Sequence, residues 1–320
     1  MSGEVSAPAD NKQTVMAASA ASRQKSTQTA LAGIGLVVAA VACFATLDIT
    51  VKHISVSVPL VMALWFRYAF QAMATTALVL PTRGFAVLRT AHPKFQVLRG
   101  ALLLTTSLIA FLSLKYMPVG EFTAIIMITP LVITLLAATS LGEKVSPMRW
   151  MLVIGGFAGA LVIIRPAQQA FSAVTLLPLA LVICNSWFQV LTSKLARTED
   201  PVTMQLYSGW SGTLLASLAL PFFWTELPHW SLWIWLALVG LMGTVGHFLL
   251  ILAYQRASAA TLTPYLYAQI GFAMLGGWLI FSHVPDQLSL VGILMITACG
   301  ATGAWLAVRE SRVAITHAES

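Results

Sequence analysis

One arginine, Arg67, lies in the middle of an apolar stretch at about residues 58–80. A guanidinium stays charged and carries only donors, so away from bulk water it must find acceptors or line a hydrated space. Gln71 follows one helical turn later and would share its face, and the aromatic Trp65 is close by. Two interpretations stay open. Arg67 holds a polar or anionic group of a solute, or it is a structural residue that donates to carbonyls freed where a proline breaks a neighbouring helix.

Two further pairs place amide side chains on helix faces. Asn185 and Gln189 are four residues apart, and Tyr265 and Gln269 repeat this spacing just after Pro264. Inside a membrane, amides either cross-link helices or, where they face a cavity, read the hydrogen-bonding edge of a neutral solute. An aromatic wall beside such amides suits a planar, mostly neutral solute. The candidate solute-binding residues are therefore Arg67, Trp65, Gln71, Asn185, Gln189, Tyr265 and Gln269.

Acidic residues are rare within the apolar stretches. Asp48 precedes Lys52 by one helical turn, which favours an intrahelical salt bridge and leaves proton coupling by Asp48 as the sharper alternative. Glu121 stands at the predicted outer start of a span, as an interfacial residue or part of a gate. Asp48 and Glu121 are thus the two candidate coupling groups. His247 lies among three glycines, a setting more typical of a helix–helix contact than of a proton relay.

The sequence predicts no catalytic residue, metal site or cofactor. An enzyme needs paired carboxylates, a nucleophile with a base, or a metal cluster, whereas the 11 acidic residues are scattered. The three cysteines lie in apolar stretches without the spacing of a disulfide or metal site, and there is no Walker motif. An integral membrane enzyme acting on a lipid or an isoprenoid carrier is therefore the disfavoured alternative.

The composition excludes a pair of soluble domains. Apolar residues make up 58% of the 320 and charged residues only 9%, against roughly 25% charged in soluble proteins. The mean hydropathy is +0.84. A chain with so little charge cannot cover a water-facing surface, but it can face lipid along most of its length. The net charge of +7 therefore does not indicate a nucleic-acid partner; we expect a lipid bilayer and a small-molecule substrate.

Breaks at charged clusters and prolines divide the chain into ten candidate membrane-spanning stretches, which predict an all-α integral membrane fold. The fifth is short, and Pro130 and Pro264 interrupt the fourth and ninth. The predicted spans are 30–51, 58–80, 97–114, 119–140, 150–164, 174–193, 202–224, 232–253, 259–281 and 287–308.

The distribution of Lys and Arg predicts the orientation of the spans. With a cytoplasmic N-terminus, fourteen of the 18 basic residues, Arg99 among them, fall on the inner side, and only Lys52, Lys115 and Arg165 fall outside. Both termini are therefore expected in the cytoplasm. Residues 1–29 are polar and rich in Ala and Ser, which predicts a disordered cytoplasmic tail, and 309–320 form a second tail.

The two halves of the chain resemble each other in sequence, as in an internal repeat. Lys52 and Pro59 between the first two spans recur as Lys194 and Pro201 between the sixth and seventh. Each half, 30–164 and 174–308, holds five spans. Because five is odd, the second half must be inverted relative to the first. Two inverted five-helix repeats are typical of secondary transporters, since mirrored halves can expose one central site to each side in turn.

Several short motifs resemble the EamA-type drug/metabolite transporters. They are Lys52-x6-Pro59, Trp65-Phe66-Arg67-Tyr68, Leu114-Lys115-Tyr116, Pro130, Leu141-Gly142-Glu143 and a glycine-rich fifth span. The resemblance covers about residues 30–308 and implies alternating-access transport of a small organic metabolite across a bacterial inner membrane. The second half departs from the family pattern, because His283 stands where the family usually has Glu and Gly209 matches Arg67.

The resemblance also supplies candidate solutes. Among those of the bacterial members, riboflavin fits the aromatic and amide content, because its ring system could stack and its uracil-like edge could pair with amides. The alternative is export of amino acids or related metabolites, with Arg67 holding a carboxylate. The direction of transport and the coupling ion stay open. Gly155-x3-Gly159 suits close helix packing within the bundle, with a homodimer contact as the alternative.

Overall fold

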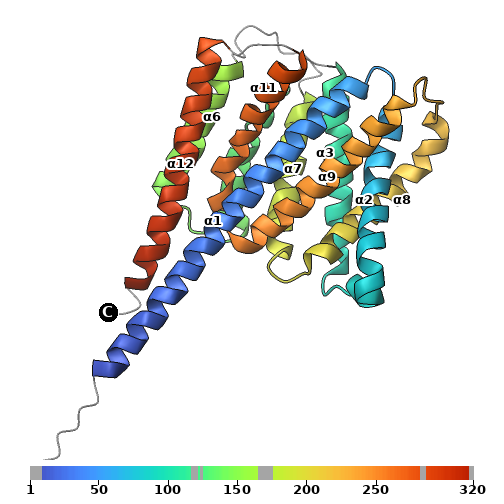
Figure 1. Ribbon diagram of the computed structural model, residues 1–320. Helices are drawn as coiled ribbons and strands as arrows, with labels where there is room; N and C mark the ends of the chain where they lie inside the picture. Colours follow the sequence, from blue (N-terminus) through green and yellow to red (C-terminus); the bar gives the residue numbers. More distant parts are fainter. Residues whose placement is uncertain (1–8, 117–121, 123–124, 165–175, 282–285, 317–320) are drawn as a thin grey trace, which may run out of the picture.

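The computed structural model describes residues 9–116, 122, 125–164, 176–281 and 286–316, and these residues form helices and connections without any strand (Figure 1). The predicted all-α fold is confirmed for the described residues, and each predicted span overlaps a helix among them. The elements are α1 (Ala9–Ile54), α2 (Leu60–Arg83), the 3₁₀ turn η1 (Gly84–Leu88), α3 (Pro93–Tyr116), α5 (Thr129–Ser140), α6 (Pro147–Ile164), α7 (Leu176–Leu195), α8 (Pro201–Phe223), α9 (Ser231–Arg256), α10 (Ala259–Leu262), η4 (Thr263–Tyr267), α11 (Ala268–Phe281) and α12 (Gln287–Thr316).

Proline and capping residues begin several of these helices. Pro93, Pro147 and Pro201 each occupy the first helical position, where a missing N–H costs nothing. Asp200 caps α8, because its Oδ1 accepts from the backbone N–H of Val202 at 2.7 Å and of Thr203 at 3.4 Å. Local sequence chemistry therefore fixes where these helices start.

Two helices extend into the predicted tails. α1 begins at Ala9 instead of residue 30, and α12 continues to Thr316, past residue 308. The stretch from 9 to 29 contains no Pro or Gly and is rich in Ala with Gln, Lys, Arg and Met, all good helix formers. The expectation of disorder does not hold for these helical residues, because low hydrophobicity does not exclude a helix that continues from an anchored one.

Four helices of the described residues are long and apolar enough to cross a membrane: residues Gln28–Ile54 of α1, α3, α7 and α9. Shorter apolar helices lie within α5, α6 and α12. The predicted breaks also occur. Pro264 lies in η4, which separates α10 from α11, and α5 starts at Thr129 with Pro130 in its first turn.

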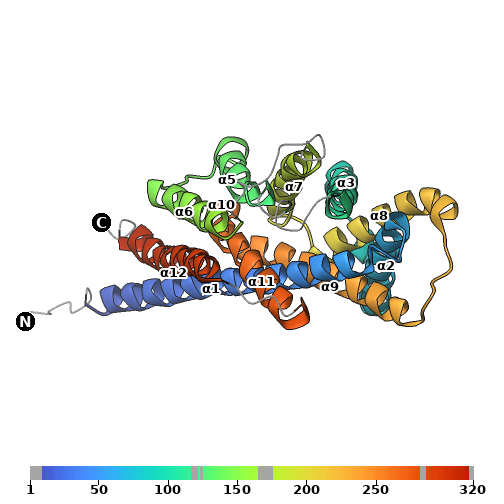
Figure 2. The same ribbon diagram turned by 90° about the horizontal axis from the view of Figure 1, so that it is seen from above.

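The two halves of the chain interlock instead of forming separate bodies. α1 packs on α9 and α11, α2 on α8 and α9, α3 on α7 and α8, α5 on α7, and α6 on α12. Figure 2 shows α6 and α12 at one side of the bundle, α2 and α8 at the opposite side, and the other long helices between them. All of these extensive contacts join a helix before residue 165 to one after residue 175.

Glycines permit the close contact between α6 and α12. A Cβ on Gly155 would lie 2.8 Å from Cys299 Sγ, and one on Gly159 would lie 3.0 Å from the backbone oxygen of Gly292. Gly155 and Gly159 therefore allow close packing of two helices inside the bundle. This is the role that the sequence analysis favoured over a dimer contact.

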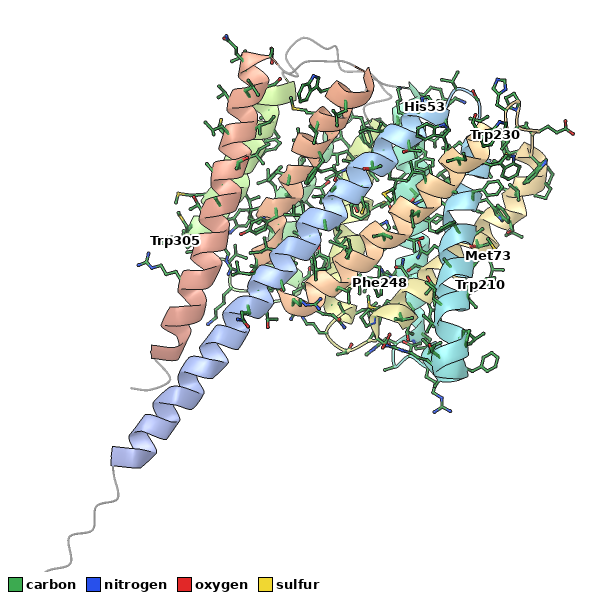
Figure 3. All side chains as sticks on the ribbon, viewed as in Figure 1. His53, Met73, Trp210, Trp230, Phe248 and Trp305 are labelled. Atoms are coloured by element: carbon green, nitrogen blue, oxygen red, sulfur yellow. The ribbon has the colours of Figure 1, made fainter. Side chains whose placement is uncertain are left out.

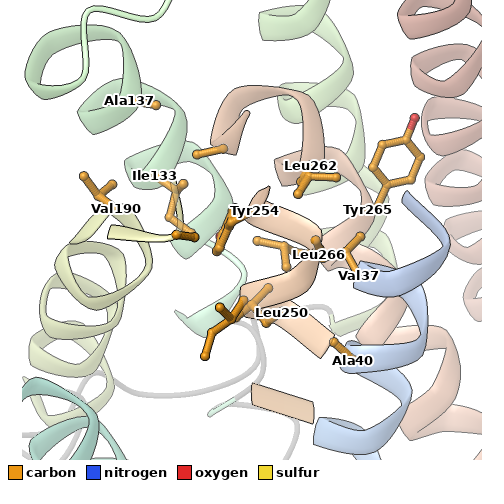
Figure 4. Packing of buried hydrophobic residues seen from close by; sticks show 14 of the residues in the cluster. Val37, Ala40, Ile133, Ala137, Val190, Leu250, Tyr254, Leu262, Tyr265 and Leu266 are labelled. Atoms are coloured by element: carbon orange, nitrogen blue, oxygen red, sulfur yellow. The ribbon is translucent and has the colours of Figure 1, made fainter. Parts of the chain in front are cut away.

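Buried apolar side chains form a core at one end of the bundle. This cluster, which we call the lower core, joins α1, α5, α7, α8, α9, α10 and η4 (Figure 4). Val37, Ile133, Val190 and Leu262 are among its fully or almost fully buried members. At the other end, His53 and the exposed Trp230 lie close to the start of α9 (Figure 3). We call these the lower end and the His53 end.

Candidate functional site

A cavity of about 720 Å³ occupies the middle of the bundle and extends toward the His53 end. Its size is within the range of small-molecule sites. The walls are mostly apolar and include the rings of Phe44, Phe111 and Phe188. Acidic, basic, amide or imidazole side chains reach the lining from α1, α2, α7, α9 and α11; they are Asp48, Lys52, Arg67, Asn185, Gln189, His247 and Gln269.

Arg67 is held by side chains from two neighbouring helices. Its Nη1 donates to Ser107 Oγ on α3 and to Tyr68 Oη at 3.3 Å, and its Nη2 lies 2.8 Å from His247 Nε2 on α9. The residue is only 3% exposed. Gly243 makes room, since a Cβ there would lie 2.8 Å from Arg67 Nε. The acceptors are therefore side chains and not carbonyls freed by a broken helix, and Arg67 still contributes to the cavity wall.

The contact with Arg67 also fixes the state of His247. Because a guanidinium has no acceptor, Nε2 of His247 must accept, so the imidazole is neutral and carries its proton on Nδ1. The imidazole packs between two cavity rings, at 4.8 Å from Phe44 and 5.6 Å from Phe188, measured between ring centroids. His247 is thus a helix–helix contact, as expected, and in addition the partner that positions Arg67.

The predicted salt bridge between Asp48 and Lys52 does not form. Asp48 Oδ2 accepts from Gln269 Nε2 at 2.9 Å, whereas Lys52 Nζ donates to the backbone oxygen of Leu114 at 2.9 Å. Both charged side chains line the cavity instead of neutralising each other. The other candidate coupling group, Glu121, lies outside the described residues.

The amide pair of α7 lies on the cavity side of its helix. Asn185 and Gln189 both belong to the lining, as their spacing of one turn requires if they share a face. Gln189 Oε1 accepts from the hydroxyl of Tyr254 on α9 at 2.7 Å. Tyr254 itself belongs to the lower core, so a buried residue orients a cavity residue.

Three of the seven candidate solute-binding residues lie elsewhere. Trp65 Nε1 donates to Ser217 Oγ at 2.8 Å and Gln71 Nε2 donates to the backbone oxygen of Gln205 at 3.0 Å, so both serve the contact between α2 and α8. Tyr265 packs in the lower core. The structure brings the other four, Arg67, Asn185, Gln189 and Gln269, to the cavity.

Arg99 on α3 is a second buried arginine that sequence analysis missed. It is fully buried, donating through Nε to Thr192 Oγ1 at 2.9 Å and through Nη1 to Ser208 Oγ and, at 2.9 Å, to the backbone oxygen of Met204. Its guanidinium carbon lies 5.2 Å from the centroid of the Phe188 ring. Instead of facing cytoplasmic water, Arg99 joins α3 to α7 and α8.

The lower end of the cavity is closed by the lower core, to which the lining residues Leu250 and Leu266 belong. Beyond it, the carboxylate of Glu143 accepts from Arg197 Nη2 at 2.5 Å and from the backbone N–H of Ala260 at 3.1 Å. Glu143 follows α5, Arg197 follows α7 and Ala260 lies in α10. One carboxylate thus ties three elements together at the closed end.

A second carboxylate at this end is Glu199, between α7 and α8, which is 6% exposed. Its Oε1 accepts from the backbone N–H groups of Ala91 and His92 at 3.1 Å each and lies 2.9 Å from His92 Nδ1. Burial alone raises the pKa of Glu199, but hydrogen bonds from His92 and Thr90 outweigh it and hold the pKa below its usual range. Glu199 therefore anchors the connection that precedes α3.

Comparison with known proteins identifies the family. The profile of the EamA-like transporter family matches residues 31–165 and 172–302, which together make up most of the chain. The chain belongs to this family. The resemblance inferred from the short motifs is thus confirmed, and the family is one of membrane transporters and not of enzymes.

The relatives of this EamA-like chain differ in what they are named for. A riboflavin transporter from Brucella anthropi is 26% identical, over 78% of this chain and 90% of its own length. An S-adenosylmethionine uptake transporter from Rickettsia bellii is 25% identical, over 82% and 90%. A pseudopaline exporter from Pseudomonas aeruginosa is 25% identical, over 83% and 94%. All three relatives are named as transporters of small molecules, but their names differ in the solute and in the direction of transport.

A solved crystal structure of a protein has the same fold. It superposes with a TM-score of 0.70, covers 89% of this chain and 98% of its own, and is 20% identical in sequence.

Proposed function

We propose that this EamA-family protein is a secondary transporter that takes up a planar, mostly neutral heteroaromatic solute, with riboflavin as the first candidate. The observation that carries the proposal is the cavity, whose apolar lining holds phenylalanine rings together with the three amides Asn185, Gln189 and Gln269. A flat ring system can stack on such walls while its polar edge pairs with the amides. The riboflavin transporter among the relatives supports this choice of solute.

Alternating access by two inverted repeats is supported by the helix contacts. Exchanging the two halves, each read in chain order, pairs α1 with α7, α2 with α8, α3 with α9, the α5 segment with α10–α11, and α6 with α12. The contact of α1 with α9 then matches that of α7 with α3, and α1 with α11 matches α7 with α5. The pairs α2–α8 and α6–α12 each map onto themselves. An approximate two-fold relation of this kind accounts for one central site that either side can reach.

With both termini in the cytoplasm of a bacterial inner-membrane protein, the His53 end is outside. The cavity then opens toward the exterior, and the lower core and the Glu143 contacts close the cytoplasmic side. Asp48 is the candidate proton-coupling group, because its carboxylate lines the cavity and has an amide, Gln269, in place of a cation as its partner. A proton gained or lost there changes the hydrogen bond between α1 and the broken-helix segment.

Uptake of radiolabelled riboflavin tests this function, in cells that neither make riboflavin nor import it otherwise. We expect saturable uptake only when the protein is expressed. Asn185→Leu should reduce uptake at low solute concentration about tenfold, the effect of one lost hydrogen bond with its partner left unpaired. Gln71→Leu is the matched control, since it removes an amide that lies outside the cavity lining, and uptake should be nearly unchanged.

Asp48→Asn addresses coupling in the same cells. If Asp48 carries the proton, the variant keeps exchange of labelled for unlabelled riboflavin but no longer responds to an imposed pH gradient. A variant with an intact gradient response contradicts the role of Asp48. Absence of any riboflavin uptake, with the protein present in the membrane, contradicts the flavin proposal.

Export of amino acids or related metabolites is the second candidate function. It is favoured by the two basic side chains of the lining, Lys52 and Arg67, which suit a carboxylate, and by the exporter among the relatives. Loading cells with labelled amino acids and following efflux distinguishes it, because an exporter speeds efflux and gives no riboflavin uptake.

A further inference from the structure

The hydroxyl of Tyr254 lies outside the cavity lining and yet contacts a residue that belongs to it. It donates to Gln189 Oε1 at 2.7 Å, from a side chain that is 3% exposed and packed in the lower core. Gln189 is 7% exposed and reaches the cavity. The contact joins α9 to α7.

This hydrogen bond determines which end of the Gln189 amide faces the cavity. If the amide were turned around, its NH₂ group would face the Tyr254 oxygen and the buried phenol would lose the acceptor that it has now. An unpaired buried donor costs more than an ordinary hydrogen bond contributes. With Oε1 held by Tyr254, the side chain has only its Nε2 hydrogens to offer a solute, and none of the hydrogen bonds described for this protein uses them.

The geometry points to Tyr254 as a positioning residue for solute specificity: it holds Gln189 as a hydrogen-bond donor, so the transported solute must bring an acceptor to this part of the cavity. This inference rests on the proposed function and narrows the class of solute. A ring carbonyl or an unprotonated ring nitrogen satisfies Gln189, whereas an amino group at the same place meets a second donor and is rejected.

Tyr267 provides a matched control. It is also a fully buried tyrosine close to the broken helix, but its hydroxyl has no hydrogen-bond partner among the described residues. Tyr267→Phe therefore removes the same atom without releasing an amide. Gln189→Glu is the complementary variant, because a carboxylate still accepts from Tyr254 but presents an acceptor to the solute.

The test measures binding of riboflavin to the purified protein, and of its analogues in which each ring carbonyl is replaced by a thiocarbonyl or a ring nitrogen by C–H. In the wild type, we expect at least one analogue to bind about tenfold more weakly than riboflavin. In Tyr254→Phe this discrimination should fall to within about twofold, whereas Tyr267→Phe should keep it. Gln189→Glu should weaken riboflavin itself by about tenfold or more.

The outcomes separate this inference from the proposed function. Riboflavin binding with the same discrimination in the wild type and Tyr254→Phe overturns the role of Tyr254 and leaves the flavin proposal intact. If the wild type binds no riboflavin, the solute proposal fails, and nuclear magnetic resonance of ¹⁵N-glutamine-labelled protein decides the inference. The Gln189 NH₂ signal, assigned by its loss in Gln189→Glu, should then exchange rapidly with cavity water; slow exchange that Tyr254→Phe accelerates shows that the amide donates to the tyrosine and overturns it.

Discussion

Arg67 and Arg99 are two buried arginines with different surroundings. Both donate to a serine hydroxyl and lie against an aromatic or imidazole ring, and neither forms an ion pair with a carboxylate in the part of the chain that the structure describes. Arg99 donates to two hydroxyls and a carbonyl and does not belong to the lining of the cavity. Arg67 lines the cavity and shares a hydrogen bond with His247, which lines it too. Burial alone therefore does not distinguish an arginine that lines a cavity from one that only joins helices; the space beside the guanidinium does.

Removal of Arg99 is expected to have the largest effect. Arg99→Met leaves the oxygens of Thr192, Met204 and Ser208 without this donor and disconnects α3 from α7 and α8, at a cost of about 3 kcal/mol or more. Little folded protein should reach the membrane, as measured by fluorescence-detected size-exclusion chromatography. Arg99→Lys cannot reproduce the same fork of donors and should rescue only partly. A well-folded Arg99→Met protein with normal uptake would contradict the clamp role.

Removal of Arg67 should affect transport more than folding. In Arg67→Met, the imidazole of His247 loses the donor that fixes its tautomer, and we expect uptake to fall at least tenfold while a large part of the folded protein is kept. The measurement is uptake divided by the amount of folded protein in the same membranes. If Arg67→Met and Arg99→Met lower both quantities in the same proportion, the distinction between the two arginines is wrong.

A single methyl group near Arg67 gives a smaller and sharper perturbation. Gly243→Ala places a Cβ 2.8 Å from Arg67 Nε, so the guanidinium must shift and its contact with His247 weakens. Uptake should fall several-fold. Gly271→Ala is the control, because its Cβ would meet open space. Alanine also has the higher helix propensity, so uptake by this variant should be unchanged. Equal uptake by both variants would show that Arg67 tolerates displacement.

The smallest effect concerns Glu199 and depends on pH. Because the pKa of Glu199 is lowered by folding, its contribution to stability is present above the unfolded pKa and is lost as the pH falls through the folded value. Glu199→Gln should lower the stability by about 1 kcal/mol at pH 7. The difference in melting temperature from the wild type should shrink as the pH is lowered below 4.5, the ordinary value for a glutamate. A difference that is constant with pH would show that the charge does not matter.

Much of the fold could be predicted because the residues that start and break its helices act locally. Pro93, Pro147 and Pro201 mark helix starts within a few residues of the predicted spans, and Pro264 breaks the ninth. The interlocking of the halves could not be predicted, because it depends on contacts between helices that are far apart in the sequence.

The candidate site was predicted where a regular helix carries it. Asn185 and Gln189 sit on uninterrupted α7 and reach the cavity together. Tyr265 and Gln269 do not reach the cavity together, because only Gln269 belongs to its lining. Tyr265 lies in the 3₁₀ turn η4, where the helical period is three residues, so it does not share a face with Gln269 on α11. Spacing predicts a shared face only when the backbone stays α-helical.

The predictions that Gln71 binds solute and that Arg99 faces the cytoplasm were wrong for a different reason. Gly209 brings α8 so near α2 that a Cβ would lie 2.9 Å from the backbone nitrogen of Ala72, which leaves Gln71 no cavity to face. Arg99 finds its acceptors on α7 and α8, far along the chain. Both outcomes are set by partner helices, which no local pattern in α2 or α3 encodes.

The interlocked halves also constrain how the protein is made. While the ribosome is still synthesising the second half, α1, α2, α3 and α6 are already in the membrane without the helices on which they pack most extensively. During this interval Arg67 lacks its partner His247, and Arg99 lacks its partners Thr192 and Ser208. The contacts between the halves can therefore form only after the helices of the second half have been made, and the contact of α6 with α12 is the last of them to become possible.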